Sequence, residues 1–250
     1  MEALRVERLS KDFGGIHAVK NVSFAVGAGD LLAFIGPNGA GKTTLLNLIN
    51  GQYKAASGSI KFFGQDITNL PTYERAALGQ ARSFQITCIF KGLSVIDNAL
   101  IAVQGTKSSQ YQPFKPISAY RSLHDKAHEI LESMELWNLK DELVRNLSYG
   151  EQRRLEVCMS LASEPRMVLL DEPSCGLSPK ECDGMMNLIR RLGENLTVII
   201  VAHDMDLVFG VAKRIIVLHY GQIIADGTCL DIQKNQQVQE IYMGIDEEGN

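Results

Sequence analysis

The feature that most limits how this 250-residue chain can fold is a glycine-rich loop set between an apolar segment and a helix-forming one. Residues 36–44 read Gly-Pro-Asn-Gly-Ala-Gly-Lys-Thr-Thr and match the pattern G-x-x-x-x-G-K-[ST], whose backbone N–H groups and lysine surround a phosphate chain. Leu31–Ile35 before the loop is predicted to be a strand buried on both faces, and Lys42–Asn50 after it a helix with Gly51 at its end. A chance glycine-rich turn is the alternative, and this strand and helix context disfavours it. The sequence therefore predicts a triphosphate site at the N-terminus of a helix.

A second motif lies further along the chain, where residues 147–152 read Leu-Ser-Tyr-Gly-Glu-Gln. Ser148 and Glu151 have the spacing of a capping box, and Leu155 and Met159 continue a helical period after them. The pattern predicts a helix whose N-terminus is exposed and can bind an anion. By itself an ordinary helix start would explain the same residues.

Two carboxylates follow another apolar run. Met167–Leu170 predicts a buried strand that delivers Asp171 and Glu172 to the edge of a sheet. We assign Asp171 to the shell of a magnesium ion, through a water molecule, and Glu172 to the polarisation of the attacking water, which are the tasks that phosphoryl transfer requires. A surface acidic pair is disfavoured by the apolar strand before it and by Pro173 after it.

Taken together, these motifs resemble the ATP-binding subunit of ABC transporters, and the resemblance runs from about Val6 to about Gly244. It implies that Phe13 stacks on adenine, although a lone phenylalanine is more often a core residue, and that Gln85 contacts magnesium. It implies that His203, at the end of the apolar strand 197–202, contacts the terminal phosphate, at the place where α/β sheets bind ligands. The predicted catalytic residues are Lys42, Glu172 and His203; the nucleotide contacts are Phe13, Gly36, Pro37, Asn38, Gly39, Ala40, Gly41, Lys42, Thr43, Thr44 and Gln85; the metal contacts are Thr43, Gln85 and Asp171.

The resemblance also implies that the Leu-Ser-Tyr-Gly-Glu-Gln helix start closes over ATP held by a facing subunit, so that two chains enclose two ATP molecules. The residues predicted to contact the facing ATP are Ser148, Tyr149, Gly150 and Glu151. The sequence departs from the family pattern at two positions: Tyr149 stands where many members have glycine, and Ser178 where they have aspartate or asparagine. A serine cannot supply a carboxylate, so we expect altered coupling between subunits and not inactivity.

We predict an α/β fold: a P-loop NTPase core with a mostly parallel sheet, an N-terminal antiparallel β subdomain and an inserted α-helical subdomain. The chain is read as a single ABC ATPase domain, with residues 1–70 and 149–235 forming the core, 71–148 the helical subdomain and 236–250 a tail. Antiparallel strands are predicted over 4–9, 22–26 and 60–63, helices over 71–78, 94–103 and 121–136, a long mobile loop over 105–118, and a hairpin over 214–225 that turns at Tyr220 and Gly221.

Composition sets limits on partners and location. No apolar run is long enough to cross a bilayer and no signal peptide is visible, so we expect the chain to stay in the cytosol and to reach the membrane only through a partner. The family resemblance implies that this partner is a set of integral permease subunits, which would hold the chain on the cytoplasmic face of the cell membrane. A solute-binding protein would be reached only through the permease. The net charge of −4 argues against nucleic-acid binding, and the five scattered cysteines suggest neither disulfides nor a zinc site.

The amino-acid sequence of four segments is similar to that of the ATPases of bacterial branched-chain amino-acid importers; these are residues 13–19, 147–156, 203–205 and 241–244. ATPases of urea-type importers and of lipopolysaccharide export share much of it, and the sequence contains no solute-contacting residue that would choose among them. Two alternative functions belong to other classes of protein. The chain could be a soluble ABC ATPase without a membrane partner, or a degenerate module that binds ATP without hydrolysing it. The cofactors implied are ATP and Mg²⁺.

Overall fold

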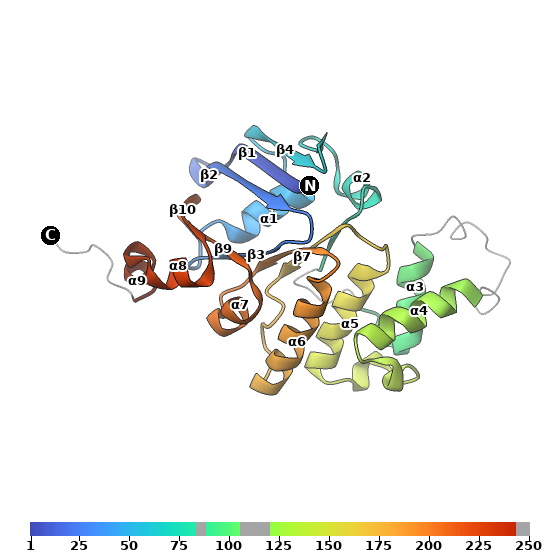
Figure 1. Cartoon of the computed structure of the whole chain (residues 1–250). Helices are drawn as coiled ribbons and strands as arrows, with labels where there is room; N and C mark the ends of the chain where they lie inside the picture. The colour runs from blue at the N-terminus through green and yellow to red at the C-terminus, as the bar shows by residue number, and fades with distance from the viewer. Residues whose placement is uncertain (84–88, 106–120, 244–250) are drawn as a thin grey trace.

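The computed structural model describes residues 1–83, 89–105 and 121–243, and its arrangement of layers is seen in Figure 1. The described strands form two sheets, one of four strands in the order β2-β1-β4-β5 and one of six in the order β10-β9-β3-β8-β7-β6. The strands are β1 (Glu2–Phe13), β2 (Ile16–Gly27), β3 (Leu31–Ile35), β4 (Ser57–Phe62), β5 (Gln65–Asp66), β6 (Gln80–Arg82), β7 (Met167–Asp171), β8 (Thr197–Val201), β9 (Arg214–His219) and β10 (Gln222–Gly227).

The four-stranded sheet is antiparallel, whereas the larger sheet is parallel from β9 to β6 and has an antiparallel pair only where β10 meets β9. The helices are α1 (Lys42–Asn50), α2 (Thr72–Ala77), α3 (Val95–Gly105), α4 (Arg121–Ser133), α5 (Tyr149–Leu161), α6 (Pro179–Leu192), α7 (Met205–Val211), α8 (Cys229–Lys234) and α9 (Gln236–Met243), with 3₁₀ turns at Trp137–Leu139 and Val144–Asn146. The predicted fold class is confirmed.

The central strands are buried on both faces because each face has its own apolar cover. Alternate residues of β3 divide between two clusters: Leu31, Ala33 and Ile35 pack with residues of α3 to α7, while Leu32 and Phe34 pack with α1 and the antiparallel sheet. Figure 1 shows the same division, with α1, β1, β2 and β4 on one side of the sheet and α5, α6 and α7 on the other. Such a two-sided core explains why the strands read as continuous apolar runs.

Several predicted elements are confirmed closely. The first helix spans Lys42–Asn50 with Gly51 at φ 80° as its cap, and the β9–β10 hairpin turns through Tyr220 at φ 44° and Gly221 at φ 76°. Both turn residues are left-handed, which matches the twist of the paired strands. The helix predicted over 121–136 ends earlier, at Ser133.

Other predictions differ from the structure. The strands predicted over 4–9 and 22–26 are longer, and β1 continues past Leu9 through irregular pairing to Phe13. The segment 71–148, read as helical, also contains β6, which pairs with β7 at the edge of the parallel sheet. A three-residue strand with a half-polar sequence carries no periodicity that would reveal it. Most of the predicted loop 105–118 lies outside the described residues, although Gly105 itself ends α3.

None of the helices in the described part of the chain is long and apolar enough to cross a membrane.

Candidate functional site

The glycine-rich loop lies between β3 and α1 and forms one wall of a cleft of about 290 Å³. Gly41 has φ 98°, and a Cβ atom there would lie 2.3 Å from the carbonyl oxygen of Ala18 on β2. Gly36 has φ 149°, and its Cβ would lie 2.1 Å from the carbonyl oxygen of Leu218 on β9. Glycine is therefore required at both ends of the loop, where backbone from two other strands approaches it.

Lys42 lies at the base of this cleft and is 7% exposed. Its ammonium donates hydrogen bonds to the carbonyl oxygens of Gly36 at 2.6 Å and Pro37 at 3.0 Å, so the side chain folds back over the loop. Burial lowers the pKa of Lys42, against the opposing effect of the charges on Glu172 and Asp171. An anion in the cleft would supply the negative charge that favours the protonated lysine.

Glu172 follows β7 and lines the same cleft as the loop. It has φ 48°, a left-handed backbone that glutamate seldom adopts, and its N–H donates a 2.7 Å hydrogen bond to the carbonyl oxygen of Val201 at the end of β8. Its carboxylate oxygen Oε1 is 3.4 Å from Nδ1 of His203, the second residue after β8. The carboxyl ends of two neighbouring parallel strands therefore bring these side chains together beside the phosphate loop.

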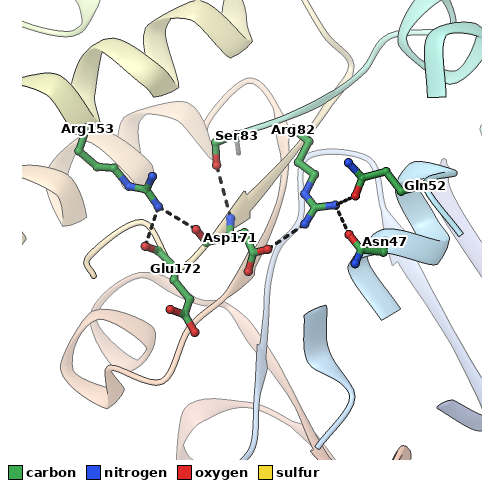
Figure 2. A network of polar contacts seen from close by, with 7 residues as sticks. All are labelled: Asn47, Gln52, Arg82, Ser83, Arg153, Asp171 and Glu172. Carbon is green, nitrogen blue, oxygen red and sulfur yellow. Dashed lines mark hydrogen bonds and ion pairs between the residues drawn. The ribbon is translucent and has the colours of Figure 1, made fainter. Parts of the chain in front are cut away.

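Asp171 is the centre of a buried polar network, drawn in Figure 2. One carboxylate oxygen accepts a 2.8 Å hydrogen bond from Arg82, the last residue of β6, in an ion pair whose side chains are 0% and 6% exposed. The other guanidinium nitrogen of Arg82 donates to side-chain oxygens of Asn47 and Gln52, at 2.5 and 2.9 Å. Burial raises the pKa of Asp171, and Arg82 acts in the opposite direction.

The described oxygens fit a hard divalent cation. Oδ1 of Asp171 is buried and has no hydrogen-bond partner among the described residues, while Thr43 lines the cleft at the start of α1. The described part of the chain contains no cluster of three or more histidine, cysteine, aspartate or glutamate side chains that could hold a metal. The carboxylate of Asp171 and the hydroxyl group of Thr43 are donors that suit Mg²⁺, which takes few protein oxygens and otherwise water and phosphate oxygens. Gln85, the other predicted metal contact, lies outside the described residues.

The start of α5 has the predicted capping box: the Ser148 hydroxyl accepts from the N–H of Glu151 at 3.2 Å, and the Glu151 carboxylate accepts from the N–H of Ser148 at 2.7 Å. The N–H of Gly150 donates to Glu181 of α6 at 3.1 Å, and the exposed ring of Tyr149 lies against Gly176. The residues that line the cleft of the phosphate loop do not include these four. Within one chain, the two predicted halves of the site are separate.

Phe13 ends β1 and is 43% exposed. Its ring packs edge-on against Tyr53 with centroids 5.3 Å apart, and the ammonium of Lys11 lies 5.1 Å from its centroid. It is not among the residues that line the cleft, whereas its hairpin neighbours Ile16 and His17 are.

Sequence reasoning missed three features of the site. Tyr220, predicted only as a turn residue, lines the cleft because β9 pairs with β3 beside the phosphate loop. The buried guanidinium groups of Arg82 and Arg153 reach Asp171 and the adjoining backbone from β6 and α5. No local pattern marks these residues, since their role depends on which elements become neighbours in space.

Known proteins of similar sequence and structure agree with this arrangement of the site. The ABC transporter family pattern matches residues 19–175. The high-affinity branched-chain amino acid transport ATP-binding proteins LivG of Salmonella typhimurium and BraF of Pseudomonas aeruginosa are 37% and 36% identical, each over 96% of this chain and 97% of that protein. The crystal structure of the ADP conformation of MJ1267, an ATP-binding cassette of an ABC transporter, superimposes with a TM-score of 0.86 at 33% identity, over 98% of this chain and 99% of that one.

Proposed function

We propose that this chain, which belongs to the ABC transporter family of ATP-binding proteins, powers the import of branched-chain amino acids through integral membrane permease subunits. As a member of that family the chain is an ATPase that binds ATP and releases ADP and phosphate. The choice of solute rests on its relatives, LivG and BraF, which are transport proteins for branched-chain amino acids. The observation that carries the catalytic part is a single cleft lined by both the phosphate loop and Glu172.

Different residues of the cleft bind ATP and catalyse its hydrolysis. The N–H groups of the glycine loop and the ammonium of Lys42 take the phosphate chain, and Lys42 exchanges its two carbonyl partners for phosphate oxygens. Phe13 contributes the stacking surface for adenine, on the hairpin that carries Ile16 and His17 into the cleft wall.

Glu172 accepts a hydrogen bond from the attacking water and polarises it toward the terminal phosphate. His203, whose Nδ1 is 3.4 Å from the Glu172 carboxylate, keeps that carboxylate in place and contacts the terminal phosphate. Thr43, Gln85 and, through a water molecule, Asp171 would hold Mg²⁺, which would neutralise charge on the phosphates. Oδ1 of Asp171 has no hydrogen-bond partner among the described residues and would be available for this role.

The site is completed by a second ATP-binding subunit, which is a copy or a close relative of this chain. Ser148, Tyr149, Gly150 and Glu151 lie outside the cleft of their own chain, at the positively polarised start of α5. We infer that this helix start contacts ATP held by the facing subunit. ATP would then draw the subunits together, and hydrolysis would release them.

Turnover and oligomeric state test this mechanism together. With Mg²⁺ and ATP the natural chain should turn ATP over, and Glu172→Gln should lower the turnover rate by about 10² to 10⁴ while leaving ATP affinity unchanged. The same variant should form an ATP-dependent dimer on size exclusion. Glu194→Gln, on an exposed residue after α6, is the matched control and should behave as the natural chain does. A folded natural chain that binds ATP without turnover would instead be a binding module.

Transport distinguishes the solutes. Vesicles that hold the chain with its permease should take up labelled leucine when ATP is present, and Glu172→Gln should abolish the uptake. Uptake of labelled urea in place of leucine, or outward movement of lipopolysaccharide, would overturn the proposed substrate and leave the ATPase mechanism intact.

A further inference from the structure

The guanidinium of Arg153 joins α5 to the backbone of the two carboxylate residues after β7. Its Nη2 donates one hydrogen bond to the carbonyl oxygen of Asp171 and one to that of Glu172, both 2.9 Å long. Figure 2 shows the side chain reaching from α5 across to this peptide. Only 4% of the side chain is exposed. A buried cation thus holds two consecutive carbonyl groups at the point where the chain leaves the strand.

The two carbonyl groups that Arg153 binds flank the Cα atom of Glu172, and the backbone at this point sets the direction of the Glu172 carboxylate. Glu172 has φ 48°, and a left-handed glutamate persists only where its surroundings fix it. Its N–H is fixed by the carbonyl oxygen of Val201, and its C=O by Arg153. Two elements therefore hold the backbone on either side of the Glu172 side chain.

The guanidinium itself is fixed from its other edge. Nη1 of Arg153 donates a 2.6 Å hydrogen bond to Glu156, one turn along α5, and the Glu156 side chain is 6% exposed. A planar guanidinium can satisfy a carboxylate with one nitrogen and two carbonyls with the other at the same time. A lysine ammonium has one nitrogen and cannot do both in this geometry.

We propose that Arg153 is a positioning residue for ATP hydrolysis: it fixes the Glu172 backbone so that the carboxylate meets the attacking water, and it makes that position depend on α5. The helix begins at the four residues inferred to contact the facing ATP, only a short way before Arg153. Movement of the helix start on that ATP therefore moves the Glu172 peptide of the same chain. This inference rests on the proposed function.

Arg153→Lys tests the proposal, with Arg154→Lys as the matched control on the next residue of α5. Arg154 contacts Glu135 and the carbonyl oxygen of Met134 and does not reach β7. We expect Arg153→Lys to lower kcat roughly ten- to hundredfold, since a small displacement of a catalytic group is enough for such a loss, while the KM for ATP stays within about twofold. Arg154→Lys should keep both constants.

A double variant separates positioning from general damage. If Arg153 acts through Glu172, Arg153→Lys should have no further effect on the residual turnover of Glu172→Gln, and the ATP-dependent dimer of Glu172→Gln should persist. Glu156→Gln keeps an acceptor for Nη1 and should lose less turnover than Arg153→Lys does. If Arg153→Lys is too unstable, Arg153→Met with Glu156→Leu removes both buried charges together and should lose the same activity.

Three results would overturn the proposal: natural kcat in Arg153→Lys, a loss that persists undiminished in the Glu172→Gln background, or an equal loss in Glu156→Gln. Turnover by the natural chain is measured first. Its absence would overturn the proposed function and this inference together, whereas turnover that Arg153→Lys leaves unchanged overturns this inference alone.

Discussion

The buried ion pair between Arg82 and Asp171 gives a prediction about stability whose size follows from its burial. Both side chains are almost completely inaccessible, and Arg82 supplies the hydrogen bond to Asp171 Oδ2. Arg82→Met leaves the Asp171 carboxylate buried without its cation. Removing one partner of a buried pair typically lowers the free energy of unfolding by about 3–5 kcal/mol, because the remaining charge is desolvated and unpaired. We expect a loss in that range at pH 7, measured by urea unfolding.

The pH dependence of this loss has a definite sign. Arg82 lowers the pKa of Asp171 and burial raises it, so Arg82→Met leaves the folded-state pKa still further above the unfolded value. A carboxyl with a raised folded-state pKa destabilises the fold above that range and has no effect once it is protonated in both states. The difference in unfolding free energy between the natural chain and Arg82→Met should therefore narrow as the pH falls toward the usual aspartate range.

Two controls make the test decisive. Arg191→Met removes an exposed arginine whose bond to Glu135 is also 2.8 Å long, and it should change the unfolding free energy by about 1 kcal/mol at most. Arg82→Met combined with Asp171→Asn should recover part of the loss, because no charge remains buried. A loss in Arg82→Met no larger than that of Arg191→Met, with no pH dependence, would refute the reasoning.

Three further predictions concern the loop, the α6 cap and the thiols. Gly41→Ala should abolish binding of a fluorescent ATP analogue, since its Cβ would meet a β2 carbonyl oxygen, while Gly39→Ala, which meets nothing within 4 Å, should weaken binding less. Hydrogen bonds from the hydroxyl group and the N–H of Ser178, the residue that caps the start of α6, lower the pKa of Glu181. Glu181→Gln should therefore reduce the melting temperature at neutral pH, and the difference from the natural chain should vanish as acid protonates the natural carboxylate. Mass spectrometry after brief alkylation should find Cys175 modified before Cys158, because Cys158 is buried and burial raises the pKa of its thiol.

The sequence predicts best what is local. Lys42–Asn50, its Gly51 cap, the Ser148 capping box and the turn at Tyr220 and Gly221 each depend on a few adjacent residues, and the structure has all of them. The buried parallel strands were equally visible as apolar runs.

What the sequence does not reveal depends on tertiary neighbours. β6 is too short to show a period, and its place beside β7 is what carries Arg82 to Asp171. Nothing in the local sequence shows that Arg153 is buried, because its contacts form only when α5 packs against the end of β7. Phe13 matches the family pattern, yet its contact with Tyr53 depends on where the loop after α1 lies.

Three contacts join the start of α5 to the loop after Glu172 and to the first turn of α6. Arg153 binds the Glu172 carbonyl, Gly150 donates its N–H to Glu181, and the Tyr149 ring lies on Gly176. A Cβ at position 176 would lie 3.0 Å from the ring of Tyr149, so the tyrosine in this place favours a glycine opposite it.

These contacts predict that the two segments open and close together. The hydrogen-bonded amides of residues 149–153 and 172–181 should share one free energy of opening, and Gly176→Ala should lower it in both segments, because Gly176 has φ 78° and the added Cβ would lie 3.0 Å from the Tyr149 ring. Gly64→Ala, in the turn between β4 and β5 with φ 84° and nothing within 4 Å of its Cβ, carries the same kind of backbone strain outside both segments; it is the control and should change neither. Faster exchange confined to 172–181 would mean that α5 does not move with the Glu172 loop, and the coupling of the facing ATP to Glu172 would then need another route.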